Sequence, residues 1–143
     1  MASLLALHPD VPTHLLELEI LETSAVSDIN YIISTIQACI DLGVHFALDD
    51  FGTGYSSLTY LRLLPASLIK IDHSFIRYML TNEDDLAIVL GVVSLAKAFQ
   101  LEVIVEGVET IEHGTVLLQL GCELAQGYGI AKPMPAIHIP QWL

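Results

Sequence analysis

Residues 44–72 read VHFALDDFGTGYSSLTYLRLLPASLIKID, and this stretch decides the fold. An apolar run, Val44–Asp49, leads through a Gly-Thr-Gly loop into a short helical segment, Ser56–Leu64, that Pro65 ends. A second apolar run, Leu68–Asp72, follows. Two short apolar runs joined by a helix are typical of a βαβ unit with parallel strands. The stretch therefore predicts a parallel sheet, with an acidic pair at the end of one strand.

The same alternation continues on both sides of this stretch. Strands are predicted at Leu15–Leu21, Glu102–Glu106 and Leu124–Ile130, and helices at Ser27–Leu42, Glu83–Phe99 and Ile111–Leu120. Ser24 or Ser27, Asn82, Gly43 and Gly121 supply the cap residues, and a Pro-rich tail with a short helix closes the chain. No loop is long enough to mark a domain boundary, so residues 1–143 are expected to form one α/β domain of about five βα units.

The composition limits which classes of ligand, partner and cellular location are expected for this protein. Apolar residues make up 53% of the chain, and 17 acidic against 5 basic residues give a net charge of −12. A nucleic-acid partner is not expected, because phosphate backbones are bound by Lys and Arg. A phosphate ligand would need another positive charge, such as a divalent metal; alternatively, the acidity only keeps the protein soluble. The sequence has no long apolar segment and no basic leader, so a cytoplasmic location without a membrane segment is expected. Cys39 and Cys122 are expected to be buried thiols.

Polar side chains fall at or near the carboxyl end of every predicted strand. In chain order they are Glu19 and Glu22, Asp49 and Asp50, Lys70 and Asp72, Glu106 and Glu109, and Gln126. Parallel strands present ligands beyond their carboxyl ends, so these side chains are candidates to converge. Carboxylates that converge bind hard cations such as Mg²⁺ or Mn²⁺. The alternative is that they are ordinary loop acids that cap the following helices.

Two of these positions carry the most specific signal. Adjacent residues of a strand point to opposite faces, so Asp49 and Asp50 can reach one site only where the strand ends and turns. Gly52 permits such a turn. Lys70 lies between Ile69 and Ile71 in an apolar strand. It is either a salt-bridged lysine at the rim of the sheet or a cation that orients an attacking water and stabilises phosphate charge.

Five motifs in this order resemble the later part of the EAL domain family. They are LELEILE (16–22), DDFGTGYSSLTYLRLLP (49–65), LIKID (68–72), VIVEGVET (103–110) and GCELAQGYGIAKPMP (121–135). The resemblance implies a partial TIM-like (β/α)8 barrel, with strands four to eight of a barrel that has one antiparallel strand. It also implies a phosphodiesterase that hydrolyses cyclic di-GMP to pGpG with two Mg²⁺ or Mn²⁺ ions.

The resemblance assigns roles to individual residues. The metal ligands it implies are Glu19, Asp49, which bridges the two ions, Asp50 and Glu106. The other roles fall on Lys70 at the attacking water, Glu109 and Gln126 in support of the site, and Glu22 as a brace of the 51–57 loop. In the family that loop is linked to dimerisation and activation.

Several family features are absent from these residues. The Glu-Ala-Leu motif, an arginine just after it and a metal-binding asparagine of the third strand do not occur, and Leu21, Val105 and Lys132 replace more usual residues. A complete barrel needs about 250 residues. We therefore expect a truncated domain that is inactive on its own and binds metal weakly.

Three interpretations of function and several partners stay open. The chain belongs to a phosphodiesterase, to a non-catalytic EAL domain that senses cyclic di-GMP or binds a protein, or to a structural interaction module. The missing barrel strands would leave open edges near Leu18 and Tyr128, so self-association is expected. A sensor or GGDEF domain upstream is a further expected partner, and cyclic di-GMP is the expected ligand.

Overall fold

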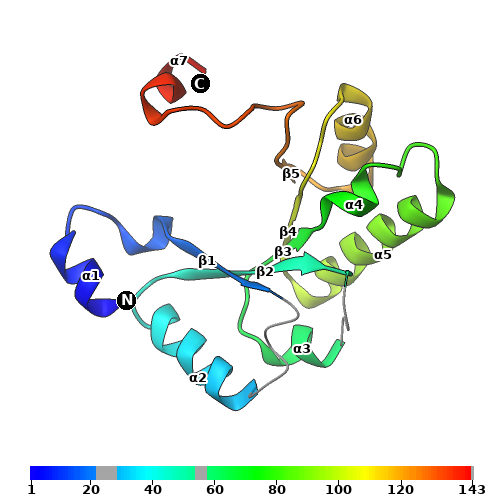
Figure 1. The fold of residues 1–143 in the computed structure, drawn as a ribbon. Helices are drawn as coiled ribbons and strands as arrows, with labels where there is room; N and C mark the ends of the chain where they lie inside the picture. The colour runs from blue at the N-terminus through cyan, green and yellow to red at the C-terminus, as the bar shows by residue number, and fades with distance from the viewer. Residues whose placement is uncertain (22–28, 54–57, 143) are drawn as a thin grey trace.

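The computed structural model describes residues 1–21, 29–53 and 58–142, which form an α/β structure (Figure 1). The strands are β1 (Glu17–Leu21), β2 (His45–Phe51), β3 (Leu68–Ile71), β4 (Glu102–Val105) and β5 (Leu124–Ala125). The helices are α1 (Ala2–Leu7), α2 (Ile29–Ile40), α3 (Leu58–Leu63), α4 (His73–Ile76), α5 (Glu83–Phe99), α6 (Ile111–Leu120) and α7 (Ile139–Trp142), with 3₁₀ turns η1 (Thr13–Leu15) and η3 (Ala136–His138).

Within the described residues, the five strands form one sheet in the order β1-β2-β3-β4-β5, and every pair is parallel. Each strand pairs with the next strand of the chain, and between β1 and β5 a helix lies in every connection. This is the repeated βαβ arrangement that the alternating pattern predicts. β1 and β5 lie at the two edges of the sheet, and the carboxyl ends of all five strands point the same way.

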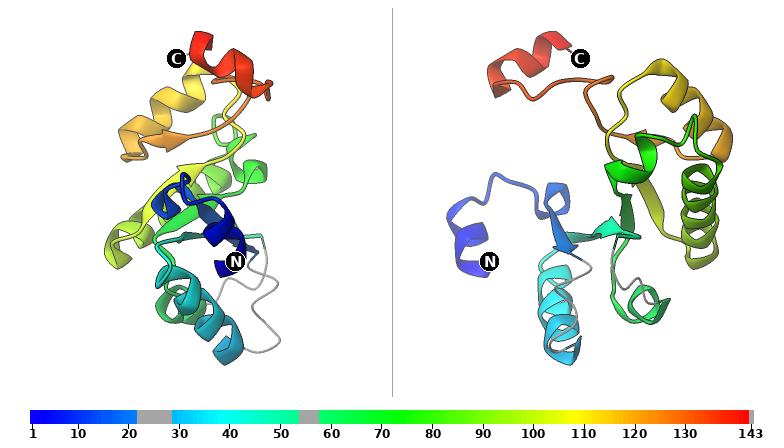
Figure 2. Two further views of the ribbon diagram at one scale, coloured as in Figure 1. Left: turned by 90° about the vertical axis from the view of Figure 1, so that its left-hand side faces the viewer. Right: turned by 45° about the vertical axis from the view of Figure 1, so that its right-hand side comes forward.

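The two faces of the sheet differ in chemistry. Side chains of one face, such as Phe46, Leu48, Ile69 and Val105, are buried in the apolar core. The helices α2, α3, α5 and α6 lie along that side of the curved sheet (Figures 1 and 2). Because successive residues alternate between faces, the residues between these, among them Glu19 and Lys70, lie on the opposite face. That second face carries the polar positions.

Local sequence signals fix the ends of the long helices as expected. The Asn82 side chain accepts hydrogen bonds from the N–H groups of Asp84 and Asp85, at 2.9 and 3.4 Å, at the start of α5. Thr110 caps α6 in the same way through His113, and Gly121 ends it with φ +81°. These contacts satisfy backbone groups that have no partner inside the helix. The predicted bounds of both helices are confirmed.

Replacing Gly91 by alanine is expected to stabilise the protein. Gly91 lies inside α5, and a Cβ atom there would meet no atom within 4 Å. Alanine loses less conformational entropy than glycine in a helix, so the free energy of unfolding should rise by about 0.5–1 kcal/mol. Urea unfolding monitored by circular dichroism measures the change. A lower midpoint than that of the unmodified chain would contradict the expectation.

Some predicted bounds are wrong. The fifth strand was expected to continue to Ile130, but β5 ends at Ala125 and residues 128–130 form a turn. Gly127, with φ +155°, and the Gly127–Ile130 hydrogen bond turn the chain away from the sheet. The first strand begins at Glu17, because Leu15 belongs to a 3₁₀ turn. The helices α1 and α4 are short and carry no pattern long enough to predict them.

The structure also bears on two expectations from the composition, which concern membrane-spanning segments and the two cysteines. In the part of the chain that the structure describes, no helix is long and apolar enough to cross a membrane. Cys39 and Cys122 are both free thiols; Cys122 is buried as expected, whereas Cys39 is only half-buried.

Candidate metal centre

The register of the sheet places five polar side chains on its second face. Glu19 pairs across strands with Ala47, and Lys70 pairs with Ile104. Side chains at paired positions of parallel strands lie on the same face, as do side chains two residues further along. The residues that share this face near the carboxyl ends of the strands are Glu19, Asp49, Lys70, Glu106 and Gln126. The sheet thus brings together residues up to 107 positions apart (19 to 126).

Lys70 lies at the centre of this group. Its side chain is only 8% exposed, and its Nζ atom lies 2.5 Å from Glu19 Oε1, 2.5 Å from Glu106 Oε1 and 3.4 Å from Asp49 Oδ1. Burial by itself would lower the pKa of Lys70, but the hydrogen bonds to Glu106 and Glu19 outweigh it and raise the pKa above its usual range. Lys70 is therefore an ammonium ion at neutral pH and can donate protons in hydrogen bonds but not accept them.

The Asp49–Asp50 pair lies at an irregularity of the sheet. Leu48 pairs with Ile69 and Phe51 with Ile71, so β2 has one more residue than β3 between these points. This is the geometry of a β-bulge. Asp50 takes a left-handed conformation with φ +54°, and its N–H donates to Asp49 Oδ1 at 3.0 Å. The extra residue turns Asp50 toward the polar face, while Phe51 returns to the buried one.

Three carboxylates of this region are close enough to share one cation. Asp49, Asp50 and Glu106 each offer an oxygen atom, and these atoms lie within 4.8 Å of one another. All three side chains are half-buried. Oxygen-only ligands in such a group fit hard divalent ions such as Mg²⁺ or Mn²⁺. Glu19 is not part of this triplet and joins it through Lys70.

The electrostatics of Asp50 agree with a site that favours positive charge. Burial, followed by the negative charges of Asp49 and Asp72, raises the pKa of Asp50, and Lys70 and His73 offset this only in part. Carboxylates that raise each other's pKa bind cations favourably, because a cation removes the repulsion. The arrangement therefore holds more negative charge than Lys70 alone balances.

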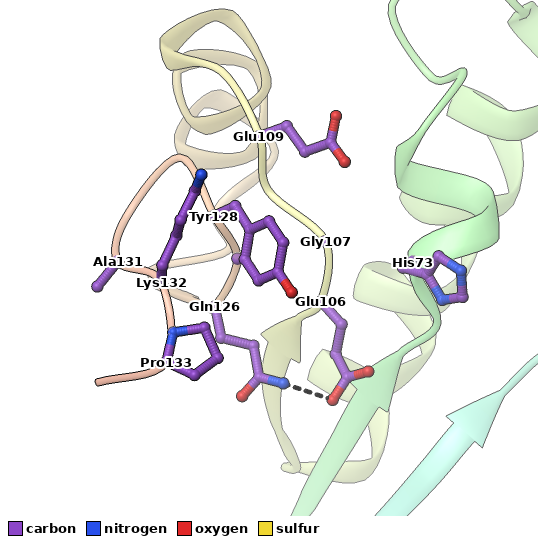
Figure 3. A pocket seen from close by; sticks show the side chains of 10 residues that line it. His73, Glu106, Gly107, Glu109, Gln126, Tyr128, Ala131, Lys132 and Pro133 are labelled. Carbon is purple, nitrogen blue, oxygen red and sulfur yellow. Dashed lines mark hydrogen bonds between the residues drawn. The ribbon is translucent and has the colours of Figure 1, made fainter. Parts of the chain in front are cut away.

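A cavity of about 570 Å³ opens beside this group, between the ends of β3, β4 and β5. Glu106 lines it and accepts a hydrogen bond from Gln126 Nε2 at 2.7 Å (Figure 3). Glu109 also lines the cavity, but its carboxylate points away from this pair (Figure 3). Sequence reasoning missed His73, Tyr128 and Lys132, which complete the wall. The available signals were the position of His73 directly after the predicted strand Leu68–Asp72, and the place of Tyr128 and Lys132 in the motif GCELAQGYGIAKPMP.

Asp72, the remaining strand-end acid, serves a local structural role. Its side chain caps α4 by accepting from Ser74 N–H at 3.0 Å, and it contacts His73 Nδ1 at 2.9 Å. Burial would raise the pKa of Asp72, but these bonds lower it below its usual value. The capping alternative is thus correct for this residue. Glu22 and residues 54–57 of the predicted loop lie outside the described residues, so the bracing role of Glu22 stays a prediction.

Replacing Gly127 by alanine is expected to disturb the wall of the cavity. A Cβ atom at Gly127 would lie 2.3 Å from the carbonyl oxygen of Val108 and 2.4 Å from its nitrogen. Backbone atoms cannot move aside as a flexible side chain can, so the free energy of unfolding should fall by about 2 kcal/mol. Urea unfolding measures this, with Gly114→Ala as the control because a Cβ there meets no atom within 4 Å. Equal stability of the two variants would contradict the close approach.

Comparisons with known proteins agree with this geometry. The family model described as EAL domain matches residues 1–133. The chain is 43% identical over 129 residues to the bifunctional diguanylate cyclase/cyclic di-GMP phosphodiesterase MucR of Pseudomonas aeruginosa, covering 90% of this chain and 19% of that protein. It therefore spans about a fifth of the length of this curated relative.

Solved structures show the same relationship. The chain matches the cyclic di-GMP complex of the PaMucR phosphodiesterase with a TM-score of 0.90 and 39% identity, covering 96% of this chain and 56% of that one. The EAL domain of Mycobacterium smegmatis DcpA gives a TM-score of 0.91 at 39% identity, covering 99% and 65%. The manganese and cyclic di-GMP complex of Klebsiella pneumoniae BlrP1 gives 0.84 at 29%, covering 92% and 34%. The predicted resemblance is confirmed: this chain belongs to the EAL domain family.

Proposed function

We propose that this chain contributes the described site to a metal-dependent phosphodiesterase that hydrolyses cyclic di-GMP to pGpG. The observation that carries the proposal is the convergence of four carboxylates around buried Lys70 at the carboxyl ends of the strands. Relatives and structural neighbours described as cyclic di-GMP phosphodiesterases, or as complexes with that ligand, support the choice of substrate.

Each residue would have a distinct role in such a site. Asp49, Asp50 and Glu106 would hold a divalent ion, with Glu19 as a further ligand. A bound Mg²⁺ or Mn²⁺ ion supplies a Lewis acid and lowers the pKa of water. Lys70 keeps its positive charge and is placed to stabilise negative charge on a phosphate and to orient the attacking water. Gln126 fixes the Glu106 carboxylate by its hydrogen bond, and Glu109, which lines the adjoining cavity, would support the site there.

Hydrolysis by the full-length protein tests this proposal. The protein is incubated with cyclic di-GMP and Mn²⁺, and products are separated by chromatography. Linear pGpG is expected. Binding without hydrolysis would favour the second candidate, a non-catalytic cyclic di-GMP sensor, which the cavity beside Glu106 also accommodates. If the protein neither bound nor hydrolysed cyclic di-GMP, both candidates would be overturned and a protein-interaction module would remain.

We also propose that the 143 residues on their own are inactive and bind metal weakly. Among the described residues, three carboxylates, those of Asp49, Asp50 and Glu106, are close enough to share one cation. The fourth, Glu19, has a side chain that is 50% exposed at the β1 edge of the sheet. A second ion would need ligands that this group does not supply. Clear pGpG production by the isolated 143-residue chain with Mn²⁺ would contradict this.

The edges of the sheet support a further proposal, self-association. Within the described residues β1 and β5 each pair on one side only, and Leu21 and Leu124 at these edges are 45% and 43% exposed. Unpaired apolar edges favour pairing with another chain. Analytical ultracentrifugation of the 143-residue chain is expected to show a dimer or higher oligomer, and a compact monomer at high concentration would contradict it.

The relatives suggest the setting in which the domain works. MucR is described as carrying both diguanylate cyclase and phosphodiesterase activities, and DosP of Escherichia coli as an oxygen sensor. We propose that a sensor or GGDEF domain shares a polypeptide with this one, and that the protein acts in the cytoplasm, where such a second messenger is found. Sequencing the gene upstream of Met1 tests the first point.

A further inference from the structure

His73 lies on the wall of the cavity beside the candidate metal centre. It is the first residue of α4 and comes soon after Lys70 of β3. It lines the cavity of about 570 Å³ together with Glu106 (Figure 3). Gly107, directly after Glu106, has φ +76°, and a Cβ atom there would lie 2.6 Å from the Cβ atom of His73. The missing side chain of Gly107 therefore lets His73 pack against the backbone that carries Glu106.

Asp72 orients the imidazole ring of His73. The Nδ1 atom lies 2.9 Å from Asp72 Oδ2, and the Asp72 side chain is only 10% exposed. Burial would raise the pKa of Asp72, but the hydrogen bonds from Ser74 and His73 lower it, so the carboxylate is ionised and Nδ1 donates to it. A carboxylate at one ring nitrogen fixes the tautomer and the orientation of a histidine. The second nitrogen, Nε2, makes no hydrogen bond or ion pair in the described part of the chain, and 68% of the side chain is exposed.

The proposed hydrolysis must deliver a proton to its leaving group. When a phosphodiester is cleaved between phosphorus and a sugar 3′ oxygen, that oxygen leaves as a strongly basic alkoxide unless it is protonated in the same step. The attacking water and the leaving oxygen lie on opposite sides of the phosphorus atom. Lys70, which is proposed to orient the water, is buried, whereas the cavity opens beside the metal group. With the water at Lys70, the leaving oxygen faces the wall of the cavity.

His73 is the best-placed proton donor on that wall. The side chains that line the cavity and can exchange a proton are His73, Glu106, Glu109, Tyr128 and Lys132. Glu106 is held by Lys70 and Gln126, and the Glu109 carboxylate points away from Glu106 and Gln126 (Figure 3). Of the remaining three residue types, histidine gives up and regains a proton most readily near neutral pH. The Asp72 carboxylate also stabilises the imidazolium form from which such a proton is given.

We infer that His73 donates a proton from Nε2 to the 3′ oxygen that leaves when the phosphodiester is hydrolysed. The water oxygen bonds to phosphorus, the bond from phosphorus to the 3′ oxygen breaks with its electron pair on that oxygen, and the Nε2 proton completes the new hydroxyl group. The surplus proton of the water passes to solvent, and solvent reprotonates the imidazole, so the net change is the addition of one water molecule. The inference rests on the proposed function. The alternative is that His73 only makes a local contact with Asp72 at the start of α4.

A change of leaving group in the full-length protein with Mn²⁺ tests the inference. The two substrates are cyclic di-GMP and an analogue in which sulfur replaces the leaving 3′ oxygen, because a thiolate leaves without a proton. His73→Gln is expected to slow cleavage of cyclic di-GMP about 100-fold and cleavage of the sulfur analogue less than about 3-fold. Binding of cyclic di-GMP in EDTA, measured by calorimetry, should change less than about 2-fold, because the proton is given only in the transition state. Asp72→Asn, whose side-chain oxygen can still accept from Ser74 N–H, should slow cyclic di-GMP cleavage about 10-fold and also spare the analogue.

His45→Gln is the matched control. It makes the same substitution at an exposed histidine that begins β2, at the amino end of the strand and away from the cavity. Equal losses for both substrates in His73→Gln, no loss for cyclic di-GMP, or an equal effect of His45→Gln would overturn the inference while the proposed function stands. Absence of cyclic di-GMP cleavage by the unmodified protein would overturn the proposed function and the inference with it.

Discussion

Replacing Asp49 by asparagine is expected to lower the proposed phosphodiesterase activity of the full-length protein by more than about 100-fold. Asp49 contributes one of the three oxygens that lie within 4.8 Å of one another, and its Oδ1 lies 3.4 Å from Lys70 Nζ. Asparagine has the same shape but no charge. Its side-chain oxygen can still accept the hydrogen bond from Asp50 N–H, so the bulge should survive. The loss should therefore appear in metal affinity and rate rather than in folding.

Initial rates of pGpG formation across a range of Mn²⁺ concentrations measure this effect. Urea unfolding of the same variant should differ from the parent by less than about 1 kcal/mol. Asp41→Asn is the matched control, because Asp41 is exposed after α2, contacts Gln37 and lies outside the metal group. If Asp49→Asn kept its activity, or if Asp41→Asn lost as much, the proposed metal site would be wrong.

Replacing Lys70 by methionine is expected to destabilise the metal-free protein by about 2–3 kcal/mol. Methionine is of similar length and uncharged, so Glu19, Asp49 and Glu106 would keep their positions but lose their common cation. Breaking a buried ion pair by removing one partner costs about 3–5 kcal/mol, and the 50% exposure of Glu19 reduces that figure here. The remaining carboxylates would then repel one another.

Urea unfolding in EDTA measures the loss of stability of the Lys70→Met variant, and unfolding in excess Mg²⁺ measures how much of that stability the ion restores. Mg²⁺ should stabilise the Lys70→Met variant more than the parent, because the freed carboxylates bind the ion and binding stabilises the folded state. Lys132→Met is the control: Lys132 is exposed, and its loss should change stability by no more than about 0.5 kcal/mol. Equal stability of the parent and Lys70→Met in EDTA would show that the ion pairs contribute nothing.

The candidate site was predictable because of a regularity of parallel sheets. The sequence places a polar residue near each strand end, and parallel strands gather their carboxyl ends at one edge. Glu19, Asp49, Lys70, Glu106 and Gln126 meet as that reasoning requires. For Lys70 the structure shows the salt-bridged alternative, with Glu19, Asp49 and Glu106 as partners, and the role at an attacking water stays a prediction.

Other features of the site had no signal in the sequence. Asp72 has the same strand-end position as the others, yet it caps α4, because the chain enters a helix at once after β3. The fifth strand was predicted to continue to Ile130, since apolar alternation does not reveal that residues 127–129 lie against Val108 and Glu109. Such close approach depends on another segment of the chain.

By itself the sequence determined the order of the five strands and of the longer helices between them, the caps at Asn82 and Gly121, and the identity of the polar residues at the strand ends. These depend on interactions between near neighbours in the chain, which propensity and periodicity describe. Only the tertiary structure decided that an extra residue in β2 turns Asp50 into the site, that Glu19 reaches the site through Lys70, and that Lys132 and Tyr128 flank a cavity beside Glu106. The physical reason is register: cross-strand pairing fixes which distant residues share a face.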